Sequence, residues 1–201
     1  MKARSEEPTR ENSSNMNGFG KTKIGSTLDA LKAAVQGEVS ASAKYKQYSE
    51  AAKQAGFDRV GALFAAASDA EKVHIRLEHN LVKEEEPDWA LPEPDAAPTL
   101  PVDLSLIDAA NGEIYETSDM YPAFLDKAHE EGREDAVKVF TKAKLAESVH
   151  AERYLAAYNN LDAADDDAFW VCPGCGYIEK GEFAPEKCPI CGCPASSFKR
   201  Y

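Results

Sequence analysis

The chain has 201 residues, of which 43% are hydrophobic, and its formal net charge is −12. The hydrophobic content excludes disorder of the whole chain, and the acidic balance argues against a nucleic-acid binder, because phosphate contacts need clustered Lys and Arg. No apolar run approaches the ~20 residues that span a bilayer and the polar N-terminus lacks a signal peptide's apolar core, so we expect a cytoplasmic protein that does not contact a membrane.

Helical periodicity dominates the chain after a flexible or extended tail at residues 1–25. Apolar spacing, N-cap residues and stop residues predict helices at about 26–55, 58–84, 104–131 and 133–160. We expect a kink or break in the third helix at Pro122, because proline lacks the backbone donor of a helix interior. Residues 85–103 hold five prolines and cannot be helical. Two hairpins joined by one long crossover form the connectivity of an all-α, ferritin-like four-helix bundle, which we place at 26–161.

The two hairpins carry the same pattern of metal-ligating side chains. Each has a glutamate on its first helix and a Glu-x-x-His sequence on its second: Glu38 with Glu71 and His74, and Glu113 with Glu147 and His150. The two glutamates are 33 residues apart in one half and 34 in the other. Because helix residues three apart share a face, the four glutamates and two histidines can converge. This is the ligand set of carboxylate-bridged di-iron and di-manganese bundles, and carboxylate with imidazole suits iron.

Further side chains lie near this pattern. Glu116 shares a face with the third helix's glutamate and is a candidate seventh ligand that would let one metal ion change partners with oxidation state. The alternative is an exposed glutamate near the bundle end. Tyr45 and Tyr121 are either donors of hydrogen bonds to ligand carboxylates or core residues. His79 and His129 lack such partners and are expected at the surface or at helix ends.

All five cysteines fall in the last 30 residues. Four of them form two Cys-x-x-Cys pairs with 12 residues between the pairs: Cys172 with Cys175, and Cys188 with Cys191. This spacing predicts a tetrahedral thiolate site for a metal rather than disulfides. Four thiolates accept iron or zinc, so a structural zinc ribbon is the alternative. The unit at 167–201, which follows an acidic linker, is too small to be stable without its metal, and Cys193 is expected to be a spectator.

Together these features resemble the rubrerythrin family, and within it most of all the nigerythrin subgroup. The resemblance covers the chain from about Gly25 onward. It rests on the duplicated Gly-Glu and Glu-x-x-His motifs, on NGEIYETSDMYPAF (111–124), on AKLAESVHAERYLAAY (143–158) and on the two Cys-Pro-x-Cys-Gly knuckles. It implies a di-iron site in the bundle and a C-terminal rubredoxin-like domain that holds one iron by four thiolates.

The resemblance also implies roles for individual residues. It implies that Glu71 and Glu147 bridge the two irons. Glu38 would be a terminal ligand of the first iron, and Glu113 and His150 terminal ligands of the second. Glu116 and His74 would exchange as ligands of the first iron. The exchange would accompany the change between oxidised and reduced iron. Tyr45 and Tyr121 match family positions beside the ligands.

The implied activity is reduction of hydrogen peroxide to water in oxidative-stress defence. Two ferrous ions hold the two electrons that this reaction needs, and protons would come from a ligand carboxylate or tyrosine. The iron–thiolate centre would return electrons singly, refilled by an NAD(P)H-dependent reductase or a rubredoxin. The family also implies a homodimer, with the rubredoxin-like domain of one subunit near the di-iron site of the other. Two alternatives stay open: a ferroxidase or oxygen-reducing ferritin-like protein, and a non-enzymatic iron-binding redox module.

Overall fold

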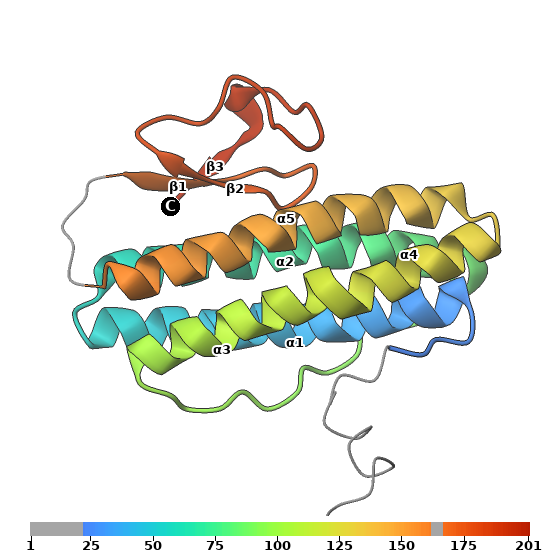
Figure 1. Cartoon of the computed structure of the whole chain (residues 1–201), viewed down its shortest axis with the longest axis horizontal. Helices are drawn as coiled ribbons and strands as arrows, with labels where there is room; N and C mark the ends of the chain where they lie inside the picture. Colours follow the sequence, from blue (N-terminus) through green and yellow to red (C-terminus); the bar gives the residue numbers. More distant parts are fainter. Residues whose placement is uncertain (1–21, 162–166) are drawn as a thin grey trace, which may run out of the picture.

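Helices α1 and α2 form the first hairpin of a helical bundle, and α3 to α5 form the second (Figure 1). The computed structural model describes residues 22–161 and 167–201, so most of the expected N-terminal tail and acidic linker lies outside it. The bundle elements are α1 (Thr27–Gln54), α2 (Asp58–Glu85), α3 (Val102–Tyr115), the π-helical turn η2 (Glu116–Met120), α4 (Tyr121–Glu130) and α5 (Glu134–Asn159). Within the described residues, no helix combines the length and the apolar character that crossing a membrane requires.

The helix ends follow the sequence signals. The Ser26 hydroxyl caps α1 by accepting a hydrogen bond from the Asp29 backbone N–H at 3.1 Å, which satisfies one of the donors left free at a helix start. Gly56 and Gly132 turn the two hairpins at φ angles of +85° and +69°, in a region that side chains with a Cβ rarely adopt. The predicted hairpins are therefore confirmed.

The interruption of the third predicted helix precedes Pro122 rather than lying at it. In η2 the Tyr121 N–H donates to the Glu116 carbonyl, five residues earlier, which is the pairing of a π-helical turn. Pro122 then occupies the second position of α4, within the first turn of an α-helix, where proline is tolerated. The expected irregularity is therefore present, but it is a π turn that ends two residues before the proline rather than a break at the proline itself. The π turn absorbs the register change, and the chain continues as a helix through the proline.

The crossover between α2 and α3 runs along α1, on the face of the bundle opposite the small domain (Figure 1). Side chains of Gln36, Ser40 and Gln47 on α1 form hydrogen bonds of 3.0 to 3.2 Å with its backbone. These contacts, spread along three turns of α1, hold the proline-rich segment against the helix.

The apolar core of the bundle is divided into two clusters with a polar layer between them. One cluster contains Phe64 and Tyr154 and the other contains Phe124 and Phe140. Burying polar groups without partners costs free energy. The two apolar clusters therefore have to offset the free-energy cost of burying the polar layer between them.

The small domain is a three-stranded antiparallel sheet of order β2-β1-β3 with two cysteine loops. Its elements are β1 (Ala168–Val171), β2 (Ile178–Gly181), the short helix η3 (Ala195–Ser197) and β3 (Lys199–Arg200). It lies along α2 and α5 (Figure 1). Asp69 on α2 accepts hydrogen bonds from Lys199 at 2.5 Å and from the Tyr201 hydroxyl, so the C-terminal strand is tied to the bundle.

We expect Asp69→Asn to loosen this docking. Burial opposes the charged form, but hydrogen bonds from Lys199, Lys72 and Tyr201 hold the pKa of Asp69 below its usual value. At a pH above the ordinary pKa of aspartate, the carboxylate therefore stabilises the folded chain. This stabilisation is lost as the pH falls through the lowered pKa of the folded state. Because the site is partly exposed, we expect a loss of at most about 1 kcal/mol and faster hydrogen exchange in β3.

Hydrogen exchange followed by mass spectrometry measures the change. Glu130→Gln, which removes the exposed Lys127–Glu130 pair on α4, is the matched control. Equal exchange in β3 for both variants would show that Asp69 does not hold the strand.

Candidate metal centres

Four glutamates and two histidines from α1, α2, α3 and α5 converge in the polar layer of the bundle. They form two overlapping groups, each with its ligand atoms within 4.8 Å of one another: Glu38, Glu71, His74 and Glu147; and Glu71, Glu113, Glu147 and His150. All six side chains are at most 1% exposed. Glu71 and Glu147 belong to both groups, which is the placement required of carboxylates that bridge two ions.

Eight buried nitrogen and oxygen atoms of these six side chains have no hydrogen-bond partner among the described residues. They face one another instead. Nδ1 of His74 lies 2.6 Å from Oε1 of Glu147, and Nδ1 of His150 lies 2.7 Å from Oε2 of the same carboxylate. Buried polar atoms are almost always paired, so this set fits two cations, which would satisfy all of them with carboxylate and imidazole ligands.

The electrostatics of the protein alone are those of crowded carboxylates. Burial, and then Glu147, raise the pKa of Glu38 and hold that of Glu113 well above its ordinary value. Burial also raises the pKa of Glu71 to about 7. Glu147 differs, because against the effect of burial His74 and the other histidine hold its pKa below the usual range. Cations in the site would favour the charged form of every one of these carboxylates.

The small domain fixes the tautomer of both histidines. Nε2 of His74 lies 3.0 Å from the Cys175 carbonyl oxygen, and Nε2 of His150 lies 2.9 Å from that of Gly176. Since a carbonyl only accepts, each Nε2 carries a proton, which leaves Nδ1, on the side of the carboxylates, as the nitrogen available to bind a metal ion. A Cβ on Gly176 would lie 2.4 Å from Nε2 of His74, so this approach requires glycine.

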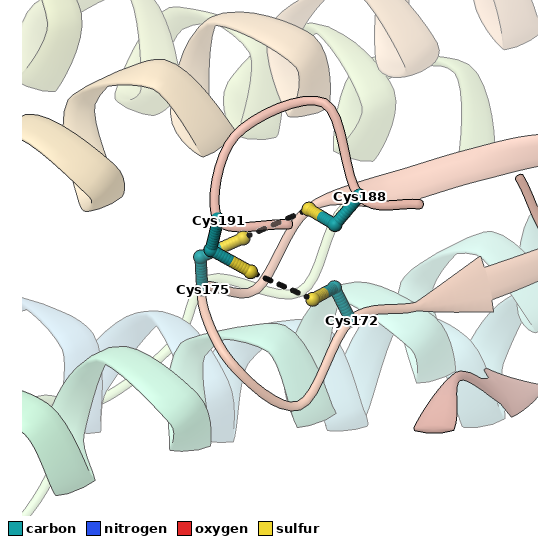
Figure 2. Close-up of side chains that lie close together, drawn as sticks. All are labelled: Cys172, Cys175, Cys188 and Cys191. Carbon is teal, nitrogen blue, oxygen red and sulfur yellow. Dashed lines mark hydrogen bonds between the residues drawn. The ribbon is translucent and has the colours of Figure 1, made fainter. Parts of the chain in front are cut away.

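The four paired cysteines form a second group with ligand atoms within 4.8 Å of one another. Figure 2 shows the two loops facing each other, with Sγ of Cys172 3.4 Å from that of Cys191 and Sγ of Cys175 3.5 Å from that of Cys188. Such a cluster of sulfurs fits one tetrahedral ion. Cys193 is outside the group but adjacent to it, because its Sγ lies 2.6 Å from the position of a Cβ on Gly174.

Two tyrosines contact the bundle carboxylates. The Tyr45 hydroxyl donates to Oε1 of Glu113 at 2.6 Å, and the Tyr121 hydroxyl donates to Oε1 of Glu38 at 2.5 Å. Both phenols are at most 2% exposed. Each therefore orients one carboxylate that belongs to only one of the two metal groups.

Glu116 is the predicted ligand that lies outside both groups. It is the first residue of η2, is partly buried and lines a cavity beneath the crossover. Its exchange with His74 stays a prediction. The other two histidines lie away from the metal groups: Nε2 of His79 is 3.1 Å from the Trp89 carbonyl oxygen, and His129 is exposed in the last turn of α4.

Sequence reasoning missed Glu78, which is fully buried on α2. Its Oε1 lies 2.9 Å from the Tyr121 hydroxyl, which already contacts Glu38. A hydroxyl has one proton, so it donates to only one of two carboxylates, and with Glu38 ionised the second bond needs a proton on Glu78. Burial, and then Glu38, raise the pKa of Glu78 well above its ordinary value. The available signal was its spacing, one helical turn after His74.

The comparisons with known proteins cover both parts of the chain. A family model described as rubrerythrin matches residues 29–158, and one described as the rubredoxin-like domain of rubrerythrin matches residues 170–199. Nigerythrin of Nitratidesulfovibrio vulgaris (strain Hildenborough) is 56% identical over 100% of both chains. Rubrerythrin of Clostridium perfringens is 31% identical, over 87% of this chain and 94% of that protein.

Solved structures agree with these matches. The fully reduced, all-ferrous state of nigerythrin aligns with a TM-score of 0.87 at 56% identity and covers 100% of both chains. Reduced symerythrin from Cyanophora paradoxa aligns with a TM-score of 0.61 over 73% of this chain and 91% of that one, and at 20% identity it supports the fold alone.

Because Glu147 belongs to both metal groups and Glu113 to one, the two substitutions should differ in metal content. We expect Glu147→Ala to lose both bundle ions and Glu113→Ala to retain one. Elemental analysis after anaerobic loading with Fe(II), corrected for the ion of the small domain, gives the count. Glu78→Gln, which keeps a neutral hydrogen-bonding group outside both groups, should bind as many ions as the unaltered chain. Equal metal content in all variants would rule out this ligand assignment.

Proposed function

The chain belongs to the rubrerythrin family, in its nigerythrin subgroup, and from this premise we propose that it is a non-haem di-iron peroxidase that reduces hydrogen peroxide to water. The observation that carries the proposal is the direct contact between its two metal groups. The backbone carbonyl oxygens of Cys175 and Gly176, in the first of the two cysteine loops, accept hydrogen bonds from the histidines of the carboxylate site in the same chain. The proposal includes a role in oxidative-stress defence in the cytoplasm.

Iron in the bundle site would supply two electrons, which with two protons convert one hydrogen peroxide molecule into two waters. The residues of the chain bind and orient the ions and handle the protons. Glu78, held as a neutral acid, is hydrogen-bonded to Tyr121, which in turn donates to Oε1 of Glu38. This chain of bonds can pass a proton inward to that oxygen. Glu116, three residues beyond Glu113 and close to the site, is the carboxylate that we propose exchanges with His74 as a ligand.

The small domain is proposed to return electrons one at a time, as four-thiolate iron sites do. Cys175 is a member of the thiolate group, and its own carbonyl accepts the Nε2–H of His74. One residue therefore joins the two centres. The external donor would be an NAD(P)H-dependent reductase or a rubredoxin.

The arrangement of subunits is part of the proposal. The family resemblance implies that the small domain of a partner subunit covers the histidines, whereas in this single chain the chain's own domain occupies that surface. A homodimer that exchanges these domains would preserve the same contacts with different connectivity.

A ferroxidase role and a non-enzymatic redox role are the two alternatives to the peroxidase, and the experiment below distinguishes all three. Iron storage needs no attached electron carrier, and here a four-thiolate domain is docked directly on the metal-binding histidines. We expect anaerobic, fully reduced protein to be oxidised faster by hydrogen peroxide than by an equal concentration of dioxygen in stopped-flow absorbance. Oxidation no faster with peroxide, with iron accumulating beyond the two sites, would indicate a ferroxidase. No peroxide-dependent turnover with any reductant would indicate a non-enzymatic module.

Replacing the iron of the small domain by zinc should separate the two steps. Zinc accepts four thiolates but does not change oxidation state. We therefore expect the zinc-substituted protein to be oxidised once by hydrogen peroxide at an unchanged rate and then to stop, even with excess reductant. Protein with iron at both sites is the control. Continued turnover of the zinc form would show that electrons bypass the small domain.

A further inference from the structure

A cavity of about 260 Å³ lies between α1, α3 and the crossover. Its lining includes Gly37, Lys44, Tyr45, Asp95, Gly112 and Glu116. The crossover that forms its outer wall lies on the face of the bundle opposite the small domain (Figure 1) and is held to α1 by the hydrogen bonds of Gln36, Ser40 and Gln47. The cavity is therefore bounded by fixed elements.

The lining of this cavity includes direct neighbours of the bundle metal groups. Tyr45, which lines it, donates its hydroxyl to Glu113, a member of one group. Gly37 and Gly112 also line it, and each directly precedes a carboxylate of the site, Glu38 or Glu113. The cavity thus lies between the crossover and residues that are next in sequence, or hydrogen-bonded, to one carboxylate of each metal group.

Neither of these glycines is explained by backbone conformation or by packing. Glycine inside a helix costs about 1 kcal/mol relative to alanine, and neither residue has a positive φ. A Cβ on Gly37 would meet nothing within 4 Å, and a Cβ on Gly112 would meet only Tyr45 Oη at 3.9 Å and Lys44 Nζ at 4.0 Å. Gly61 on α2 is different, because its Cβ would lie 2.5 Å from Lys53 Cγ.

A side chain at position 37 or 112 would extend into the free volume of the cavity. We propose that this cavity is the route by which small hydroperoxides reach the metal centre, and that Gly37 and Gly112 keep it open. The proposal rests on the peroxidase function and adds a size limit to its substrate. The walls offer hydroxyl, ammonium and carboxylate groups beside alanine and proline side chains. The Lys44 ammonium forms an ion pair with Asp108 at 2.9 Å. The polar groups can form hydrogen bonds with hydrogen peroxide, and on this proposal the passage beside the two glycines is too narrow for a hydroperoxide with a bulky hydrocarbon group.

The test uses the full, iron-loaded chain with Gly37→Ala, Gly112→Ala and Gly37→Leu. Ala33→Leu is the matched control, because Ala33 is exposed on α1 one turn earlier and is not part of the lining. Three quantities are measured: the rate at which nitric oxide binds to the reduced protein, the rate of oxidation by hydrogen peroxide and by cumene hydroperoxide, and the thermal stability of the metal-free protein.

We expect Gly37→Leu to slow nitric oxide binding and peroxide oxidation by at least about tenfold, the scale of discrimination by steric fit in a pocket. The two alanine variants should show smaller decreases, and Ala33→Leu none. Cumene hydroperoxide should react far more slowly than hydrogen peroxide with the unaltered chain. The metal-free alanine variants should melt at higher temperature than the unaltered chain, because alanine favours the helix.

The outcomes separate the two proposals. Slowed nitric oxide binding in an otherwise peroxide-inactive protein would support the route and overturn the peroxidase function. If hydrogen peroxide oxidises the unaltered chain, and every variant binds nitric oxide and reacts with hydrogen peroxide as fast as that chain, the route is overturned and the peroxidase function is not. Alanine variants that are less stable than the unaltered chain would also overturn it, because packing would then explain the glycines.

Discussion

The central constraint on this fold is the burial of four carboxylates and two imidazoles within a few ångströms of one another. An isolated buried charge is very unfavourable, so the surrounding structure has to supply partners or cations. The Tyr45 hydroxyl donates a hydrogen bond to one oxygen of Glu113, and the Tyr121 hydroxyl donates one to an oxygen of Glu38. The small domain satisfies the outer nitrogens of both histidines. What is left unsatisfied is the inward-facing set of atoms, and this is the set that two metal ions would bind.

Much of this arrangement could be predicted from the sequence because it depends on local spacing. The 3.6-residue period sets the helices, and the three-residue spacing of Glu71 and His74 sets a common face. Other features depend on contacts between residues far apart in the sequence, or on which backbone hydrogen bonds form within a single helical turn. The donor–acceptor bond between His74 and the Cys175 carbonyl joins residues 101 positions apart. Pro122 signals a disturbance of the helix, but only the backbone pairing places the π turn before it.

The two hairpins share a ligand pattern, yet their surroundings differ. One turn after its histidine, the first hairpin carries Glu78, whereas the second carries Tyr154, whose buried hydroxyl has no hydrogen-bond partner among the described residues. Within the described chain, the π turn occurs only in the second hairpin. A duplicated ligand pattern therefore has different neighbouring side chains in its two halves, and this difference could not be read from the repeat itself.

The placement of the crossover and the small domain on opposite faces of the bundle (Figure 1) has a consequence for chemical self-damage. Cysteine thiolates are attacked by peroxide and pass through sulfenic to irreversibly oxidised forms. The helices that carry the bundle ligands stand between the cavity and the four cysteines. An oxidant that followed the proposed route from the crossover side would therefore reach the ligand carboxylates of the bundle before it reached a cysteine sulfur.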